Sequence, residues 1–161
     1  MFGFKKKEDR NEELCAVVDG TLIAIEDVKD PVFSQKMMGD GFAIDSTGDC
    51  IYACADAKIT MLFPSNHAIG LTLENGMEIL IHVGIDTVNE NGKGFTCYCK
   101  QGDHVKKGDV LLKMDRAYLS EKNYDLTVIV IFTNAATYTS FRREEKHKVK
   151  GGEDIVVTYT I

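Results

Sequence analysis

The sequence predicts an all-β protein, an antiparallel β-sandwich or barrel with one or two short surface helices. Valine, isoleucine and threonine number 13, 13 and 12 among the 161 residues, and such β-branched side chains favour strands. About eleven short apolar runs follow one another at intervals of roughly 8–12 residues, which is the spacing of strands in sandwiches and barrels. Stretches with helical periodicity are scarce, and this favours the same fold class.

Residues that favour turns close the apolar runs and so define the expected strands. Asp19 and Gly20 follow the first run, the polar stretch 46–49 follows the third, and the stretch 64–66 follows the fifth. The expected strands are, in order, 15–18, 21–25, 41–45, 50–54, 58–63, 68–73, 77–83, 94–99, 109–114, 126–132 and 154–161.

Helices are expected at few places. Residues 33–38 suit one helical turn, and 116–123 and 135–145 suit short surface helices. The charge-rich stretch 142–154 is interpreted as a solvated link to the last strand. A weak similarity between residues 16–25 and 53–62 suggests two interlocked β motifs.

Length and composition indicate one globular domain at 14–161, preceded by a flexible N-terminal tail at 1–13. Apolar residues make up 44% of the chain and charged residues 27%. A net charge of −6 disfavours a nucleic-acid-binding surface. Because no apolar run approaches the roughly 18 residues that a membrane helix needs, we expect no stable membrane insertion.

The N-terminal residues lack the apolar core and the cleavage site of a secretory signal, so we expect a cytoplasmic protein. Cysteines stay reduced in that compartment. We interpret them as small buried apolar residues, with a four-cysteine zinc site as the alternative. The five cysteines are Cys15, Cys50, Cys54, Cys97 and Cys99.

Two of the four histidines, His67 and His82, occupy positions that favour a catalytic or ligand-binding role. His82 ends an apolar strand and is followed by Gly84 at two residues' distance, where a ligand or partner can approach the backbone closely. His104 and His147 lie in polar stretches and are interpreted as exposed residues without a functional role.

A hairpin turn brings the two histidines together. Asn-Gly dipeptides favour two-residue hairpin turns, and Asn75 and Gly76 separate the two histidine-bearing strands. With these two residues at the centre of the turn, Ile69 faces His82, and His67 lies diagonally across from His82. Diagonal side chains of an antiparallel pair are about 7–8 Å apart at Cα and share a face. The sequence therefore predicts two imidazoles on one face of one hairpin.

Two neighbouring imidazoles suit either metal binding or phosphoryl transfer. Neutral ring nitrogens bind zinc, which needs a third ligand. In phosphoryl transfer, one imidazole nitrogen attacks phosphorus and the second imidazole donates a hydrogen bond to the transferring oxygens. Asp86, four residues after His82, suits a metal ligand or a contact for a partner's arginine.

Four segments of the sequence resemble the glucose-type enzyme IIA family of the bacterial sugar phosphotransferase system. They are GDGFAI (39–44), SNHAIGL (65–71), IHVGIDTV (81–88) and QGDHVKKGD (101–109). The resemblance extends from about residue 14 to residue 161. It implies an antiparallel β-sandwich with interlocked repeats, and a phosphocarrier that takes a phosphoryl group from the histidine protein HPr and gives it to a cysteine of enzyme IIB.

The resemblance also implies roles for individual residues. His82 matches the phosphorylated histidine, His67 matches the histidine that stabilises the phosphoryl group, and Ser65 stands where a threonine usually orients that second histidine. Asp30 and Asp86 match acidic positions that meet an arginine of HPr. The apolar docking surface around the histidines is expected at Val32, Phe33, Met37, Met38, Phe63 and Val88.

Two alternatives remain open from the sequence. A zinc hydrolase of related β architecture uses an H-x-x-x-D ligand pair, which His82 and Asp86 resemble, but it also needs a later H-x-H motif that this sequence lacks. A regulatory binding module, controlled by phosphorylation, is compatible with the phosphocarrier role. The phosphocarrier requires no metal, although His67 and His82 could share a zinc ion with a partner in a regulatory complex.

Overall fold

The structure, a computed structural model, describes residues 11–134 and 138–160. These residues form fourteen strands in three antiparallel sheets, with two short α-helices and two 3-10 helices. The predicted fold class is therefore confirmed. The strands are β1 (Asn11–Cys15), β2 (Gly20–Ala24), β3 (Asp40–Ser46), β4 (Cys50–Tyr52), β5 (Ala57–Leu62), β6 (Ala68–Leu73), β7 (Glu78–Val83), β8 (Phe95–Cys97), β9 (His104–Val105), β10 (Val110–Met114), β11 (Val128–Phe132), β12 (Thr139–Arg143), β13 (Lys148–Val149) and β14 (Ile155–Thr160).

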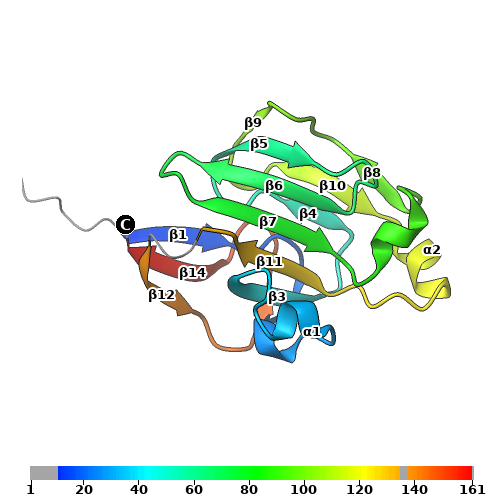
Figure 1. Ribbon diagram of the computed structural model, residues 1–161, viewed down its shortest axis with the longest axis horizontal. Helices are drawn as coiled ribbons and strands as arrows, with labels where there is room; N and C mark the ends of the chain where they lie inside the picture. Colours follow the sequence, from blue (N-terminus) through cyan, green and yellow to red (C-terminus); the bar gives the residue numbers. More distant parts are fainter. Residues whose placement is uncertain (1–10, 135–137, 161) are drawn as a thin grey trace, which may run out of the picture.

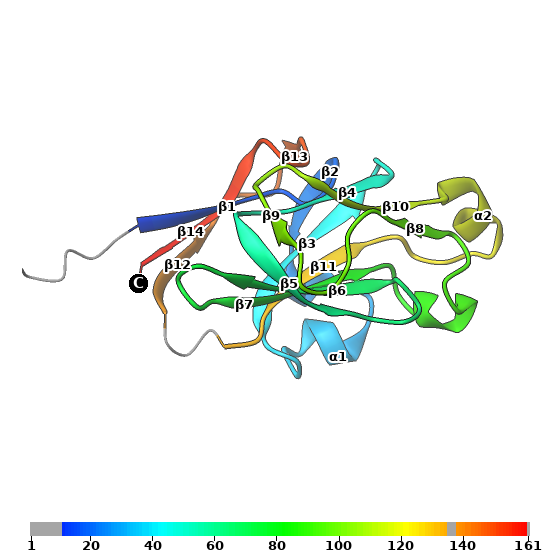
Figure 2. The same cartoon turned by 90° about the horizontal axis from the view of Figure 1, so that it is seen from above.

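One large sheet forms the centre of the molecule, with strand order β13-β2-β3-β11-β7-β6-β5-β9. Two three-stranded sheets, β1-β14-β12 and β4-β10-β8, accompany it. Figure 2 shows β4 and β10 on one side of the large sheet and helix α1 (Pro31–Ser34) on the other. Helix α2 (Arg116–Glu121) lies at the end of the molecule opposite β1, β12 and β14 (Figure 1).

Side-chain alternation divides the apolar residues of the large sheet between two cores. In β7, Ile79, Ile81 and Val83 are buried in the main core, while Leu80 and His82 point to the opposite face. Each fully buried aliphatic side chain contributes roughly 1.5–3 kcal/mol of transfer free energy. A second, smaller core lies on the opposite face and consists of Ile25, Val28, Phe33, Ala43, Ile129 and Ile131.

Helix α1 and the 3-10 helix η1 (Ile25–Asp27) supply part of that second core. Asp30 caps α1, since its carboxylate accepts a hydrogen bond from the backbone N–H of Val32 at 2.9 Å. Pro31 occupies the first helical position, where its missing N–H costs nothing. The helical turn expected at 33–38 therefore begins two residues earlier than predicted and ends at Ser34.

The chain termini of the domain differ from the prediction. Strand β1 begins at Asn11, so residues 11–13, which were expected in the tail, pair with β14. The helix expected at 135–145 is wrong over the part that the structure describes, because Thr139–Arg143 forms β12 and pairs with β14. Residues 135–137 lie outside the described residues, as do residues 1–10 of the tail. Strand β13 lies within the expected loop, and the surface helix expected at 116–123 is confirmed by α2.

The hairpin between β6 and β7 has a register that differs by one residue from the predicted one. The N–H of Leu73 donates to the carbonyl of Met77 at 2.9 Å, so three residues rather than two form the loop. Gly76 adopts a positive φ of 88° at the end of this loop, as in hairpins with a glycine bulge. Ala68, not Ile69, therefore faces His82.

Candidate functional site

His82 lies near the end of β7, on the face of the large sheet that carries the second core. The aromatic ring of Phe33, from α1, packs against it with ring centroids 5.0 Å apart. Pairing with Ala68 of β6 and Ile129 of β11 fixes the backbone of His82 from both sides. The backbone of His82 is therefore fixed between two strands, and its imidazole is covered on one side by α1.

His67 lies in the turn that precedes β6 and is 5% exposed. Its Nδ1 is 2.5 Å from the hydroxyl oxygen of Ser65, the contact that the resemblance implies for this serine. The ring of Phe63 packs on His67 with centroids 5.6 Å apart. The carbonyl of His67 accepts a hydrogen bond from Val83 at 2.8 Å, which ties this turn to the end of β7.

The two imidazoles meet edge to face, with ring centroids 4.9 Å apart and an interplanar angle of 82°. They meet although the predicted register is wrong by one residue. His67 precedes the first residue of β6, and Asn66 before it has a positive φ of 55°. Because this turn does not follow the alternation of a strand, the ring of His67 reaches the face that carries His82.

Burial of His67 and His82 favours the neutral form of both imidazoles. It lowers the pKa of His82 to about 4, and the neighbouring His67 acts in the same direction. The backbone of Gly84 and the charges of Asp30 and Asp86 oppose this shift without cancelling it. Burial also lowers the pKa of His67. Both rings are therefore uncharged at neutral pH, as a nucleophile requires.

The two ring nitrogens of His82 differ in accessibility. Nδ1 is buried and makes no hydrogen bond of good geometry among the described residues, although the backbone of Gly84 lies close enough to the ring to raise its pKa; the side chain as a whole is partly exposed. Nε2 is therefore the nitrogen that can react with a group arriving from outside.

We expect His82 to stay neutral as the pH falls to about 4. In the unfolded chain a histidine titrates near pH 6.5. Between these two values the unfolded chain binds more protons than the folded one, so His82 makes the free energy of unfolding fall as the pH falls. NMR titration of the imidazole checks the midpoint, and urea unfolding of the wild type and His82→Gln at several pH values checks the linkage. A midpoint near pH 6.5 contradicts the expectation.

The segment after β7 turns sharply because of Gly84, which has a φ of 80°. A Cβ at this position would lie 2.5 Å from the Cγ2 of Thr87, so a larger residue would push the segment away. The hydroxyl of Thr87 donates to the carbonyl of Val83 at 2.5 Å. Asp86 follows Gly84 with an exposed side chain and a positive φ of 62°, at the start of the 3-10 helix η2 (Thr87–Glu90).

Four of the apolar side chains that the sequence places on a docking surface are exposed: Val32, Met37, Met38 and Val88. Phe63 is half-buried and lines an open depression of about 410 Å³ together with Ser65, His67 and Val88. Phe33 differs from these four residues, since it is only 5% exposed and its ring packs against His82.

Met61 extends this apolar surface and was missed from the sequence. It is exposed and pairs with Gly70, which in turn pairs with Leu80. A Cβ at Gly70 would lie 3.1 Å from the Cβ of Met61, so the two positions share a face. A register shift in β5 just before Met61 turns it outward, and the sequence contains no signal for that irregularity.

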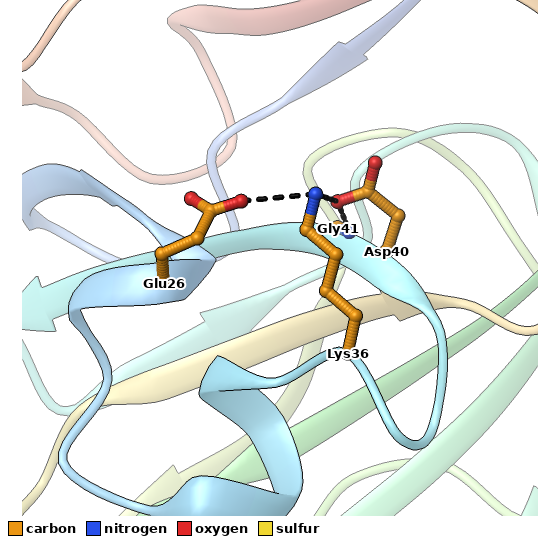
Figure 3. Close-up of polar contacts among 4 residues, drawn as sticks. All are labelled: Glu26, Lys36, Asp40 and Gly41. Carbon is orange, nitrogen blue, oxygen red and sulfur yellow. Dashed lines mark hydrogen bonds and ion pairs between the residues drawn. The ribbon is translucent and has the colours of Figure 1, made fainter.

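The loop that carries Met37 and Met38 is attached to the sheet through Lys36 (Figure 3). The ammonium group of Lys36 lies 3.0 Å from the carboxylate of Glu26 and 3.4 Å from that of Asp40. These ion pairs raise the pKa of Lys36 and lower that of Glu26. Because the pairs are about half exposed, each is worth at most about 1 kcal/mol, and their effect is to orient the loop.

His67 and His82 could supply two ligands to a metal ion, and a third would have to come from elsewhere. Within 11–134 and 138–160, no cluster of three or more histidine, cysteine, aspartate or glutamate side chains is arranged to hold a metal. The described cysteines are free thiols.

The described helices are all too short or too polar to cross a membrane.

Comparison with known proteins agrees with this fold. The family model described as phosphoenolpyruvate-dependent sugar phosphotransferase system, EIIA 1, matches residues 12–138. The glucose-specific EIIA component of a Staphylococcus epidermidis strain is 38% identical over all of this chain and 97% of its own length. The glucose-specific EIICBA component of Streptococcus pneumoniae is 39% identical over 86% of this chain and 19% of its own length.

A solved structure gives the same result. The glucose permease IIA of Mycoplasma capricolum superposes with a TM-score of 0.86 and 35% identity, and the match covers 98% of this chain and 99% of that one. Since the family model spans well over half of the chain and the relatives align over nearly all of it, this chain belongs to the EIIA 1 family of the phosphoenolpyruvate-dependent sugar phosphotransferase system.

Proposed function

We propose that this chain is a cytoplasmic phosphocarrier that accepts a phosphoryl group from HPr on His82 and passes it to the cysteine of a sugar-specific enzyme IIB. The contact between His82 and His67 carries the proposal, because it joins a neutral nucleophile to a second imidazole at 4.9 Å between centroids. Membership of the EIIA family supports a role in sugar uptake. The Streptococcus pneumoniae relative, an EIICBA component, supports an enzyme IIB partner.

In the proposed transfer, the lone pair of Nε2 of His82 forms a bond to phosphorus. The bond between phosphorus and the histidine of HPr breaks at the same time, and its electron pair returns to that imidazole. Such transfers have a loose transition state, so positioning and hydrogen-bond donors around the phosphoryl oxygens matter more than a strong base. In the second transfer, the cysteine thiolate of enzyme IIB takes the phosphoryl group and His82 recovers its lone pair.

His67 supplies the donor to the phosphoryl oxygens. When the hydroxyl of Ser65 donates to Nδ1 of His67, the proton of this neutral imidazole stays on Nε2. That N–H is then available to donate to a phosphoryl group on the neighbouring ring of His82, whose centroid lies 4.9 Å from that of His67. No metal and no cofactor other than the phosphohistidine is required.

The exposed apolar side chains around His82 suit docking of two different partners at one nitrogen. Val32, Met37, Met38 and Val88 exclude water when a partner covers them, and methionine side chains repack against unlike surfaces. Asp30 and Asp86 lie close enough to His82 to influence its pKa, and they offer carboxylates to a partner's arginine.

Reconstitution with phosphoenolpyruvate, enzyme I and HPr tests the proposal. We expect the chain to acquire an acid-labile phosphate, and we expect it to lose this phosphate on addition of a cognate enzyme IIB. A chain that stays unlabelled while a known EIIA is labelled under the same conditions would contradict the proposal. Family membership favours this function over the zinc hydrolase considered from the sequence.

Ser65→Ala is expected to slow phosphoryl acceptance about tenfold, which is the effect of losing one hydrogen bond worth roughly 1.4 kcal/mol. The ring of His67 loses the contact that fixes its orientation and tautomer. Rapid-quench measurement of acceptance from phospho-HPr checks the rate. Ser65→Thr keeps the hydroxyl and serves as the control; equal rates for Ser65→Ala and wild type would contradict the role of Ser65.

A further inference from the structure

The carboxylate of Glu90, at the end of η2, is held by three donors. The hydroxyl of Tyr118 donates to one oxygen and that of Tyr124 to the other, each at 2.6 Å. The ammonium group of Lys122 lies 2.9 Å from the first oxygen, and the Glu90 side chain is only 8% exposed. These donors lower the pKa of Glu90 to about 2, so the group stays ionised at any physiological pH.

The donors come from α2 and the residues that follow it. Helix α2 is also attached to the loop that contains η2, residues 84–94 between β7 and β8. Asp115 caps the helix by accepting from the N–H of Tyr118 at 3.1 Å. The backbone N–H of Asp115 donates to the carbonyl of Gly94 at 2.7 Å. A Cβ at Gly94 would lie 2.9 Å from Leu119, so loop and helix pack without a gap. Helix α2 and the residues after it thus hold the loop at two points, Glu90 and Gly94. We call the contacts of Glu90 with Tyr118, Tyr124 and Lys122 the brace.

The braced loop carries two residues of the proposed docking surface and has little regular structure of its own. Val88 and Asp86 are exposed on it. Positive φ values at Asp86, Asn91 and Gly92 show that the backbone turns repeatedly, and η2 is only four residues long. Such a segment has many alternative conformations unless long-range contacts fix it.

We propose that Glu90 is a positioning residue for partner docking, which with Tyr118, Tyr124 and Lys122 holds η2 so that Val88 and Asp86 are presented in the orientation that the phosphoryl donor binds. The inference rests on the proposed function. Without the brace, the loop has to be ordered when the donor binds, and this ordering weakens docking. The two histidines lie on β7 and in the turn before β6, outside η2, so we expect the main effect on docking and only a small effect on the chemical step.

The test compares the double variant Tyr118→Phe/Tyr124→Phe and the single variant Glu90→Gln with the wild type, with phospho-HPr as the varied substrate. We expect KM to rise about three- to tenfold in the double variant, from the cost of ordering a few side chains and their loop, and kcat to stay within about twofold. Glu90→Gln keeps a hydrogen-bond acceptor but loses the ion pair with Lys122, so a smaller rise in KM is expected.

Tyr138→Phe is the matched control. Its hydroxyl donates to the carbonyl of Asn75 at 3.0 Å, at the hairpin between β6 and β7 and not in the brace. Loss of that hydroxyl is expected to leave KM unchanged. Amide hydrogen exchange provides a second readout, since exchange at Val88 and Asn89 is expected to accelerate in the double variant and not in the control.

Unchanged KM and unchanged exchange in the double variant, with a wild type that accepts phosphate, would overturn this inference alone. A fall in kcat at constant KM would overturn it as well, because the brace would then act on the chemical step. A wild-type chain that accepts no phosphate would overturn the proposed function, and the inference with it.

Discussion

Replacement of His82 by glutamine is expected to abolish phosphoryl acceptance, with a loss of at least about a thousandfold, because the amide has no basic nitrogen to attack phosphorus. The substitution keeps a polar side chain of similar length on the outer face of β7. We expect the variant to fold, as judged by its melting temperature and its amide spectrum. Incubation with labelled phosphoenolpyruvate, enzyme I and HPr checks the loss.

His67→Gln is the matched control for this experiment. The second imidazole assists the transfer without forming the bond to phosphorus, so we expect this variant to retain the label and to transfer it more slowly to enzyme IIB. Retention of label in His82→Gln would contradict the assignment of the nucleophile. Loss of label in His67→Gln with full labelling of His82→Gln would reverse the two roles.

Phe33→Ala is expected to lower the free energy of unfolding by about 3 kcal/mol, the usual cost of removing a buried phenylalanine ring. The ring is 5% exposed and belongs to the second core. It also covers His82, with centroids 5.0 Å apart. Because burial is the main cause of the lowered pKa of His82, loss of this cover is expected to raise that pKa toward 6.5.

Urea unfolding and an NMR titration of His82 check the two effects of Phe33→Ala. The neighbouring variant Val32→Ala is the control, since Val32 is exposed and its truncation is expected to change the free energy of unfolding by less than about 0.5 kcal/mol. Equal stability of Phe33→Ala and Val32→Ala would show that Phe33 is not part of a core. An unchanged pKa would show that it does not shield His82.

The pattern of apolar residues identified most of the strands, because a strand that packs on a core needs apolar side chains on at least one face. It failed at β9, β12 and β13, which no expected strand includes, and at the start of β1. β12 lies at one edge of its sheet and pairs only with β14, and β13 lies at an edge of the large sheet. An edge strand can be stabilised by the partner that it pairs with, and its own sequence then has no clear pattern.

The histidine pair was predictable from spacing, but its geometry was not. The one-residue change of register arises from a three-residue loop with Gly76 at positive φ, and Asn-Gly is compatible with loops of both lengths. The contact between Ser65 and His67 followed from the resemblance to relatives. It is local, since the two residues are two positions apart.

Contacts between residues far apart in the sequence account for what sequence reasoning missed. The burial of Phe33 depends on β7 and β11, which lie beneath α1 and follow much later in the sequence. Glu90 was not noticed because its partners Tyr118 and Tyr124 follow 28 and 34 residues later. Such residues become visible only when the fold brings the elements together.

The position of the phosphoryl group on the phosphorylated chain tests the account most directly. Long-range ¹H–¹⁵N NMR of uniformly ¹⁵N-labelled protein, phosphorylated by HPr, distinguishes the two nitrogens of each imidazole. Burial of Nδ1 predicts that phosphorus is bonded to Nε2 of His82, with both nitrogens of His67 unmodified. Phosphorus on Nδ1 of His82, on His67 or on any other residue would contradict the site as described.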